Sequence, residues 1–475
     1  MSKRKLGDYE ADKHEAGETP FTVPLQQVDS DRRFAELYKT EPDFRELALF
    51  DADFAPFVKN GSIEFSSPDA VMQLTKSLLS RDFGLKLEMP PDRLCPMVHN
   101  RHNYILWLKE LVDSTMPEGA RQEDVLGLDI GTGASCIYPL LGCVQRPWQF
   151  IGTDIDESNI IFARENIARN SFQSRIRLLL RSPSDPLISL SDFGVSRLTF
   201  TMTNPPFYTS LQDLRDSAAL KARPPLTACT GSAAEMVTAG GEVGFATRIL
   251  ADSLVCRERV QWYTVMFGKH ASLEEFVGSL QSHGISNYAV TEFVQGARTR
   301  RVAVAWSFSG LRPAQKAARG VRAAVWKRLL PPSTEVAVYV EKTAAEKAAM
   351  LVEALREAVW KLDLRKREWD EKRVCWTGEC GQNVWCRAYR RRKKRKAERK
   401  EREDQEREYG GPEKERGGQA KEKEVKDTAF GFQVWITATL DETKVTCRWV
   451  YGFDENTFTS FQGYIKSALA SVGGQ

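Results

Sequence analysis

Two short apolar runs, each with an aspartate at its end, constrain the fold of this chain more than any other feature. The first run, Val125–Ile130, is followed at once by Gly131-Thr132-Gly133 and then by an apolar segment with helical spacing. The second run, Gln149–Asp154, ends 23 residues after Gly131. A strand, a glycine turn, a helix and a second strand at this spacing predict a doubly wound α/β sheet with ligands at the carboxyl ends of its strands.

The residues at the ends of these two strands predict a binding site for a nucleoside-like ligand. Gly131 and Gly133 have no Cβ, so the backbone on either side of Thr132 can approach a ligand closely. Asp154 lies near the offset of about 20 residues at which an acidic side chain binds ribose hydroxyls. The alternative is that Asp129 and Asp154 only cap the helices that follow, but their paired placement at successive strand ends favours the ligand site.

A fourth strand, Leu198–Met202, leads into Asn204-Pro205-Pro206-Phe207, which we interpret as the catalytic motif. Proline fixes φ and lacks an N–H, so two prolines give a stiff loop whose neighbouring carbonyls stay free to accept hydrogen bonds. The Asn204 oxygen and the Pro205 carbonyl can together accept both N–H groups of an exocyclic amine, while the Phe207 ring stacks on a planar base. A plain Asn-Pro turn is the alternative.

The remaining pattern up to residue 310 predicts the other elements around this sheet. We expect a capped helix over 68–82 and a second helix over 104–112, with Arg101 just before it. Residues 209–240 are polar and weakly periodic, which is typical of a functional lid or a disordered loop. The other expected elements are a strand at 175–180, helices at 137–141, 157–170, 242–257 and 273–282, and strands at 262–267, 288–294 and 302–308.

Two segments of this part combine features that suit nucleic acid. The turn between the last two strands carries Arg298, Arg300 and Arg301, which suit phosphate contacts, although arginines at a hairpin tip need no ligand. Residues 31–60 predict either an arm that faces nucleic acid or an amphipathic cover over the next domain. That segment mixes cations with aromatic residues: Arg32, Arg33, Phe34, Tyr38, Lys39, Phe44 and Arg45.

The composition divides the rest of the chain into three parts. Residues 1–30 are polar and predict a disordered N-terminus, and residues 311–333 predict a linker. Residues 334–475 predict a small C-terminal α+β domain. Its expected elements are a strand at 336–340, a helix at 344–369, a hairpin of 373–377 and 384–389, strands at 432–440 and 444–451, and a helix at 456–469.

A run of seven consecutive cations, Arg390 to Lys396, opens a charged insertion that we expect to be disordered over 390–427. Its composition favours a nuclear import signal, a phosphate-binding arm, or both, with a solvated helix extension as the alternative. The residues we expect to contact RNA here are Arg390, Arg391, Arg392, Lys393 and Lys394.

Other features bear on compartment and metal content. The chain contains no run of about 18 apolar residues and no apolar signal-peptide core, so we expect an intracellular protein without a membrane span. Its nine cysteines are scattered, which suits a reducing compartment. Zinc held by Cys375, Cys380, Cys386 and Cys447 is the alternative to ordinary packed thiols, but the spacing lacks a C-x2-C pair, so we expect no metal.

Four phrases of the sequence identify a family. Over about residues 30–310, the chain resembles class I S-adenosylmethionine-dependent methyltransferases and, within them, the U6 small nuclear RNA adenine-N(6) methyltransferase family. The resemblance implies a Rossmann-like seven-stranded domain with an N-terminal helical arm, followed by a C-terminal domain similar to the kinase-associated type. It rests on GLDIGTGASCIYPLLG, TNPPF, WYTVMFGKHASL and EFVQGARTRRVAVAWSF.

The resemblance implies S-adenosylmethionine as cofactor and structured RNA such as U6 as substrate. We expect the nucleus as the location, with the cytoplasm as a further one. The resemblance also implies particular roles. Gly131, Thr132 and Gly133 match the cofactor loop, Asp154 the ribose acid (Glu in animal relatives), Arg101 an arginine near the methionine end, Asn204 to Phe207 the amine-binding motif, and Arg298 and Arg301 the RNA groove. The chain departs at Thr230-Gly231-Ser232, where relatives have a double glycine, which bears on the lid conformation.

Two other functions stay open at this point. One is an RNA-binding or splicing-assembly protein with a vestigial catalytic fold, against which the intact Asp129, Asp154 and Asn204 speak. The other is a methyltransferase that acts on a protein glutamine, because Asn-Pro-Pro motifs also serve planar amides. Phe207 and the two basic regions favour nucleic acid.

Overall fold

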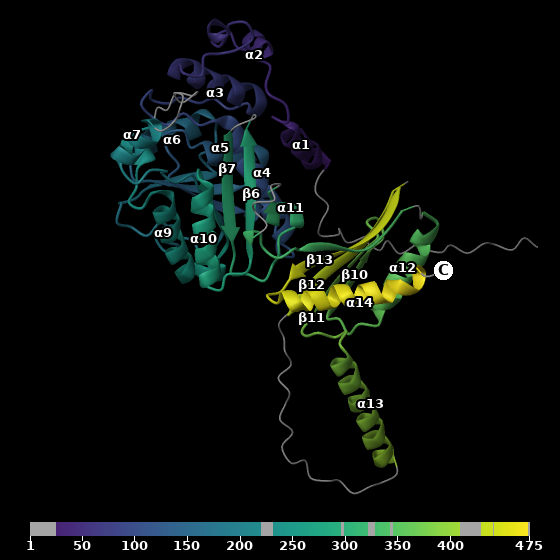
Figure 1. Cartoon of the computed structure of the whole chain (residues 1–475). Helices are drawn as coiled ribbons and strands as arrows, with labels where there is room; N and C mark the ends of the chain where they lie inside the picture. The colour runs from purple at the N-terminus through teal and green to yellow at the C-terminus, as the bar shows by residue number, and fades with distance from the viewer. Residues whose placement is uncertain are drawn as a thin grey trace, which may run out of the picture.

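The computed structural model describes residues 25–219, 231–295, 299–321, 328–342, 345–408, 429–439 and 441–473. These residues form two units side by side, which we call the N-terminal unit (residues 25–321) and the C-terminal unit (residues 328–473) (Figure 1). Each unit is built on its own sheet, with eight strands in the first and five in the second. Arg298, Thr230 and the predicted disorder at 1–24 and 409–427 lie outside the described residues.

The sheet of the N-terminal unit is doubly wound, as predicted, in the order β3-β2-β1-β4-β5-β7-β6-β8. The strands from β3 to β5 pair in parallel, whereas β7 is antiparallel to both of its neighbours. All seven predicted strands are present, and the two-residue β8 adds an eighth beside β6. Their bounds are β1 Leu126–Ile130, β2 Gln149–Asp154, β3 Ile176–Leu180, β4 Leu198–Thr203, β5 Val260–Phe267, β6 Tyr288–Gln295, β7 Thr299–Trp306 and β8 Arg319–Gly320.

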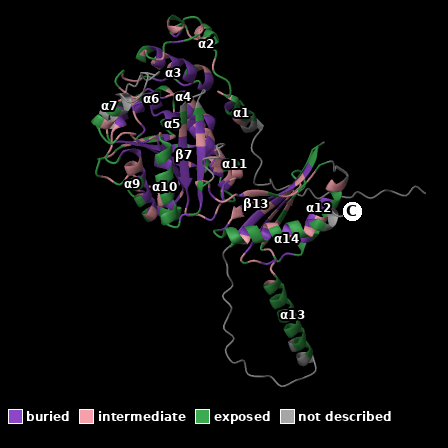
Figure 2. Cartoon of the chain, in the orientation of Figure 1, coloured by how far each residue is buried: buried purple, intermediate pink, exposed green. Residues whose placement is uncertain are grey.

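Helices cover both faces of this sheet, so the strands are buried on both sides (Figure 2). Side chains of strand β5 point alternately to the two faces of the sheet. Trp262 and Met266 belong to the core on one face, and Tyr263 and Val265 belong to the core on the other. The first core includes α3 Pro68–Phe83, α4 Val98–Thr115, α5 Ile137–Gln145 and α6 Glu157–Arg169, and the second includes α9 Gly241–Cys256 and α10 His270–Ser282.

Two glycines make room for aromatic rings in the first core. A Cβ on Gly127 would lie 2.5 Å from ring atoms of Phe200, and a Cβ on Gly142 would lie 2.4 Å from the ring of Phe150. The Phe150 and Phe200 rings themselves pack edge to face, with their centroids 5.7 Å apart. These two glycines are therefore required for packing and leave the backbone conformation regular.

The N-terminal arm packs onto the sheet domain. Helix α1, Leu25–Glu36, begins inside the segment predicted to be disordered, so that prediction is wrong from Leu25 onward, and α2 spans Phe44–Phe50. Phe34 is 3% exposed and stacks on Phe83, and the Tyr38 hydroxyl donates to Asp82 at 2.7 Å. The aromatic residues of the arm thus form the amphipathic cover, while Arg32 and Arg45 remain exposed.

The C-terminal unit is the α+β domain predicted from the sequence. Its antiparallel sheet runs β10-β11-β12-β13-β9, and α12 and α14 pack on one face of it. The elements are β9 Glu335–Lys342, α12 Ala345–Trp360, β10 Lys366–Asp370, β11 Cys375–Cys380, α13 Arg387–Glu408, β12 Phe430–Ala438, β13 Glu442–Tyr451 and α14 Glu455–Gly473.

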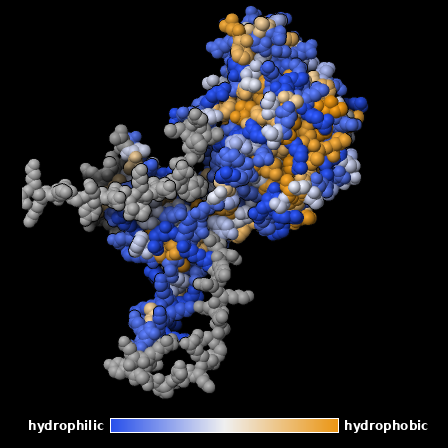
Figure 3. Space-filling model, turned by 180° about the vertical axis from the view of Figure 1, so that it is seen from behind, coloured by the Kyte–Doolittle hydropathy of each residue, from blue (hydrophilic) through white to orange (hydrophobic). Residues whose placement is uncertain are grey.

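Three predictions in the C-terminal unit are wrong. The helix predicted to reach residue 369 ends at Trp360, because residues 366–370 pair with β11 as a strand. The segment 384–389 is no hairpin arm, because Val384 and Trp385 enter the core from the loop that precedes α13. The charged insertion is helical over 390–408, where α13 projects as a hydrophilic rod (Figures 1 and 3).

The predicted linker is largely ordered against the N-terminal unit. It contains β8 and the short helix α11, Gln315–Ala318, and the Trp107 indole N–H donates to the Ala317 carbonyl at 2.9 Å. The Gln315 side-chain oxygen accepts the backbone N–H of Thr334 at 2.9 Å, at the start of the C-terminal unit. No helix in the described ranges has the length and apolar character needed to cross a membrane.

Candidate active site

The carboxyl ends of β1, β2 and β4 lie at one rim of the larger sheet and border a cavity of about 230 Å³. The structure brings most of the predicted site residues together here. Those that line the cavity are Arg101, Gly131, Thr132, Gly133, Asp154, Asn204 and Pro206, and the segment from Ser182 to Leu187 with Phe245 and Arg248 also contributes to its wall.

The glycine loop turns the chain sharply at the end of β1. Gly131 has a φ of 74° and Gly133 a φ of 64°, a region that favours glycine. The backbone N–H groups of Gly131 and Thr132 both donate to the Thr153 carbonyl at 2.9 Å, which fixes the loop to β2. A Cβ on Gly131 would meet nothing within 4 Å, so the loop presents bare backbone with open space beside it.

Asp154 is held in place by three donors. Its Oδ2 accepts the Gly133 N–H at 2.9 Å, and its Oδ1 accepts the Asp156 N–H at 2.9 Å and the Asn159 amide at 3.3 Å. Burial raises the pKa of this carboxyl, and the backbone donors oppose that shift. The carboxylate is thus oriented at the cavity wall, where it can accept hydrogen bonds from ligand hydroxyls.

Asp129 occupies a different place from the one predicted. It is fully buried within β1, one residue before the strand ends, and it is not among the residues that line the cavity. Neither of its oxygens has a hydrogen bond of good geometry among the described residues, although the Thr132 hydroxyl is near enough to oppose the rise of its pKa. Burial raises the pKa of Asp129 to about 7, and the negative charge of Asp154 adds to the rise.

The raised pKa of Asp129 predicts a pH-dependent stability. A carboxyl whose pKa is higher in the folded state than in the unfolded chain stabilises the fold when protonated, and this stabilisation is lost as the pH rises from about 4 to about 7. In the variant Asp129→Asn, the free energy of unfolding should fall less over this range than in the wild type. Urea unfolding at a series of pH values measures how the free energy of unfolding changes with pH in both proteins. The variant Asp29→Asn, at an exposed position, is the control. The same pH dependence in wild type and Asp129→Asn would contradict a raised pKa of Asp129.

Asn204 follows β4 directly, and its side-chain oxygen is a buried polar atom at the edge of the cavity. No described residue donates a hydrogen bond to this oxygen. Pro205, beside it, is buried, and Pro206 lines the cavity. A buried acceptor without a partner costs free energy unless a ligand satisfies it. This atom is therefore available to accept a hydrogen bond from a ligand in the cavity that Asn204 lines.

The Phe207 ring is held between two elements. A Cβ on Gly268, just after β5, would lie 3.0 Å from this ring, so glycine is needed for the approach. The Arg301 guanidinium lies 5.4 Å from the ring centroid. Arg301 lies in β7 and not in the predicted turn, and its pKa is lowered by burial and by the nearby Arg101 charge. The ring thus contacts Gly268 and Arg301, and Phe207 is not among the residues that line the cavity.

Arg101 also differs from its predicted position. It lies within α4, which begins at Val98, so it does not precede the helix. Its guanidinium lies 5.4 Å from the centroid of the Tyr138 ring, and it lines the cavity. Arg101 and Arg301 place two positive charges near Asn204 and Phe207, which suits an anionic group of a ligand.

Two acidic residues of the site escaped the sequence reasoning. Glu235, in the short helix α8 (Ala233–Met236), accepts the Ser232 N–H at 2.8 Å and the Leu94 N–H at 3.1 Å, and it lines the cavity. Glu242, which is 3% exposed, accepts the Gly268 N–H at 2.6 Å and so supports the backbone beneath Phe207.

The sequence contains a pattern that indicates the helix to which Glu235 belongs. Ser232 and Glu235 have the spacing of a capping box, and the Glu235 carboxylate accepts the Ser232 N–H, although the Ser232 hydroxyl has no partner among the described residues. Before α7 (Leu211–Ala219), the Ser210 hydroxyl accepts the Asp213 N–H. The predicted lid at 209–240 therefore contains two helices in its described parts.

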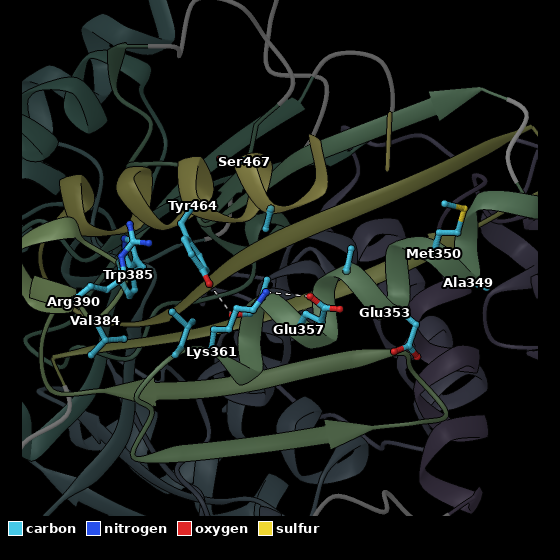
Figure 4. Close-up of a pocket in the computed structure, with 14 residues that line it drawn as sticks. Ala349, Met350, Glu353, Glu357, Lys361, Val384, Trp385, Arg390, Tyr464 and Ser467 are labelled. Carbon is cyan, nitrogen blue, oxygen red and sulfur yellow. Dashed lines mark hydrogen bonds and ion pairs between the residues drawn. The ribbon is translucent and has the colours of Figure 1, made fainter. Parts of the chain in front are cut away.

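A second hollow, of about 1000 Å³, lies on the C-terminal unit between α12, α14 and the start of α13 (Figure 4). Inside it the Tyr464 hydroxyl donates to the Ala358 carbonyl at 2.7 Å, and Lys361 pairs with Glu357 at 3.0 Å. Its polar groups are thus mostly paired with each other, and it lacks a glycine loop. The smaller cavity is the one whose chemistry fits a ligand site.

The other predicted residues lie apart from the cavity. Those from Arg390 to Lys394 lie on α13, where all five are exposed. Among the described residues, no cluster of three or more His, Cys, Asp or Glu side chains could hold a metal ion. Cys229 lies outside the described residues.

A doubly wound sheet whose strand ends hold a glycine loop, an acid and an Asn-Pro-Pro-Phe turn is the architecture of a Rossmann-like methyltransferase. A family model described as RNA methyltransferase matches residues 26–310, and the chain belongs to this family. The family resemblance drawn from the sequence motifs is thereby confirmed.

Individual relatives extend the likeness. The chain is 36% identical to the U6 small nuclear RNA (adenine-(43)-N(6))-methyltransferase of Schizosaccharomyces pombe over 416 residues. This alignment covers 87% of this chain and 96% of that protein. It is 38% identical to the RNA N(6)-adenosine-methyltransferase METTL16 of Mus musculus over 57% of this chain and half (50%) of that protein. The solved hMettl16 catalytic domain in complex with MAT2A 3'UTR hairpin 6 aligns with a TM-score of 0.50 and 37% identity, over 57% of this chain and 94% of that one.

Proposed function

We propose that this chain transfers a methyl group from S-adenosylmethionine to the N6 amine of an adenine in structured RNA, with U6 small nuclear RNA as substrate. The observation that carries the proposal is the buried Asn204 oxygen, which has no partner among the described residues and lies next to a braced aromatic ring. The activity named for the Schizosaccharomyces pombe relative and the RNA hairpin bound to the hMettl16 catalytic domain support it.

The residues of the cavity fit S-adenosylmethionine. The bare backbone at Gly131–Gly133 leaves room for close approach, Asp154 can accept the ribose hydroxyls, and Arg101 can pair with the amino-acid carboxylate. When bound, the cofactor supplies a methyl group already activated on a sulfonium. The protein therefore needs no strong general base, and its task is to position the acceptor.

The acceptor side follows from the Asn-Pro-Pro-Phe turn. Asn204 and the Pro205 carbonyl accept the two N–H groups of the adenine amine, which orients the nitrogen lone pair and favours the positive charge that develops on it. Phe207 stacks on the base. An adenine inside a duplex cannot reach this cavity, so the target is unpaired or flipped out, at a cost of about a few kcal/mol.

Two basic regions supply contacts with the RNA backbone. Arg301 lies beside Phe207, which suits contact with the phosphates that flank the target base. The family resemblance implies the same role for Arg298, which lies outside the described residues. The exposed cations Arg390 to Lys394 of α13 form the second region. The same run fits a nuclear import signal, and we propose the nucleus as the place where the chain acts.

A labelled-methyl assay tests the proposal. Purified protein is incubated with labelled cofactor and, separately, with total RNA or with total protein, and the RNA is digested to nucleosides. We expect the label in N6-methyladenosine, and we expect it to be concentrated in U6. Label in protein glutamine would favour the protein acceptor. Cofactor binding by calorimetry without transfer to any fraction would show a vestigial fold.

A further inference from the structure

The two units are joined by more than the covalent chain. Residues 310–312 pair with residues 450–452 as a short antiparallel ladder around a Leu311–Tyr451 bridge. The Arg312 N–H donates to the Val450 carbonyl at 2.8 Å, and the Gly452 N–H donates to the Gly310 carbonyl at 2.9 Å. We call residues 310–312 the docking segment. It adds a strand-like edge of the N-terminal unit to the end of β13.

Arg312 is the centre of this contact. It is 2% exposed, and its guanidinium bonds to both units: Nε donates to the Gly452 carbonyl at 2.8 Å, and Nη1 donates to the Ser286 carbonyl at 3.0 Å. Its face lies 4.0 Å from the centroid of the Trp449 ring. Burial lowers the pKa of Arg312 to about 10, and the charge of Glu455 opposes this shift. The Arg312 Nη2 also donates to the Ser286 hydroxyl at 3.4 Å. Separation of the units would break the contacts of Arg312 with Gly452 and Trp449, and these two contacts therefore favour the docked arrangement.

The surroundings of Arg312 are close-fitting. A Cβ on Gly310 would lie 2.7 Å from the Tyr451 ring, so only glycine fits at this contact. Two further contacts lie nearer the edge of the interface. Arg448 of β13 donates to the Ser114 carbonyl at the end of α4 at 3.0 Å, and Lys366 pairs with Glu118 at 2.7 Å.

Helix α13 is in turn fixed to the C-terminal unit. Asp363 accepts both the Tyr389 hydroxyl and the Lys393 ammonium, and Arg392 donates to Gln382 at 2.6 Å. The helix points away from the N-terminal unit (Figure 1). It has 22 residues, and at 1.5 Å per residue it is about 33 Å long.

We propose that Arg312 locks the C-terminal unit against the N-terminal unit, so that the cavity and α13 bind one RNA at a fixed separation. Arg312 then acts as a positioning residue that selects substrates. The preferred RNA has an unpaired adenine and a second, phosphate-dense segment that reaches α13. This inference rests on the proposed function, because it assumes that the substrate is RNA.

The physical reason for such selection is effective concentration. Once one part of an RNA is bound, the second contact becomes intramolecular, and its benefit is greatest when the two surfaces are held at the matching distance. If the units separate, that benefit falls and affinity for long RNA approaches that for short RNA. Methyl transfer itself depends only on the cavity and should not change.

Three variants test this. Arg312→Met removes the cation, and Gly310→Val drives a methyl-bearing Cβ into the Tyr451 ring without leaving a buried charge. Gly310→Val combined with Tyr451→Ala removes the obstruction and should restore docking. The substrates are a full-length U6 transcript and a shortened transcript around its target adenine. Small-angle scattering measures docking, filter binding measures affinity, and steady-state kinetics separates KM from kcat.

We expect both single variants to show a larger radius of gyration and, for full-length RNA, a Kd and KM raised on the order of ten-fold, with kcat and all values for short RNA unchanged. The double variant should return toward the wild type. The inference would be overturned if the units separate but the ratio of the Kd values for short and full-length RNA stays at its wild-type value. It would also be overturned if neither single variant increases the radius of gyration. If the wild type methylates neither RNA, the proposed function fails, and the Kd ratio alone decides this inference. Cofactor calorimetry reports whether each variant is folded.

Discussion

Replacing Asn204 by alanine is expected to lower the rate of methyl transfer by about 100- to 1,000-fold, the size of effect seen when one preorganised polar contact to a reacting group is removed. The reason lies in its side-chain oxygen, which is buried, faces the site after β4 and has no partner among the described residues. Alanine leaves the amine without this acceptor and without orientation. Single-turnover transfer from labelled cofactor measures the rate, while calorimetry and filter binding measure cofactor and RNA affinity.

Binding of both ligands should stay within about three-fold of the wild type, because the glycine loop, Asp154 and the basic regions are untouched. Asn204→Asp keeps acceptor oxygens at the same position and should retain more activity than alanine. Asn456→Ala makes the same chemical change at an exposed position of α14 and should have no effect. A variant Asn204→Ala with more than about a tenth of wild-type activity would rule out the acceptor role.

The second large effect concerns stability. Asp31→Ala should lower the free energy of unfolding by about 3 kcal/mol, because Asp31 pairs with two cations that are themselves buried. The Lys109 ammonium lies 2.7 Å from its Oδ1, and the Arg146 guanidinium bonds to Oδ2. The side chains of these cations are only 6% and 5% exposed. Arg146 keeps Asp113 as a partner at 2.8 Å, which places the expected loss at the lower end of the range for buried pairs.

Urea unfolding of wild type and variant measures this loss, with Asp29→Ala in the same helix as a matched exposed control. The pH dependence gives a second readout. Burial alone would raise the pKa of Asp31, but hydrogen bonds from Arg146 and Lys109 hold it below its usual value. Stability from this carboxylate is therefore present above about pH 4 and is lost as the pH falls below it. The gap between wild type and variant should narrow in acid, and a constant gap would argue against the ion pairs.

Sequence reasoning succeeded where local signals and the global fold agree. Strand β2 has the predicted bounds, Gln149–Asp154, because its apolar run and terminal acid both mark a buried parallel strand. Asn204 and the glycine loop meet at one cavity because parallel strands present their carboxyl ends at one rim. The resemblance drawn from these phrases extends over about residues 30–310, and the family model matches residues 26–310.

It failed where tertiary contacts override local preference. Lys366-Arg367-Glu368 are good helix formers, yet pairing with β11 draws them into a strand. Arg301 was placed in a turn, but β7 extends to Thr299, so it is carried to the side of Phe207. The sequence pattern around Arg312 did not indicate its role between the two units, because its partners, Ser286 and Gly452, lie far from it in the chain.

The glycines of the phrase GLDIGTGASCIYPLLG are required for two different physical reasons. Gly131 and Gly133 are required by backbone angle at the rim, whereas Gly127 and Gly142 are required by the volume of Phe200 and Phe150. Substitutions at the two kinds of position should therefore be rescued differently. A larger residue at Gly142 can be tolerated if Phe150 becomes smaller, but no partner change can relieve the backbone at Gly131. Of the four glycines in this phrase, Gly127 and Gly142 can therefore covary with distant residues, whereas Gly131 and Gly133 cannot.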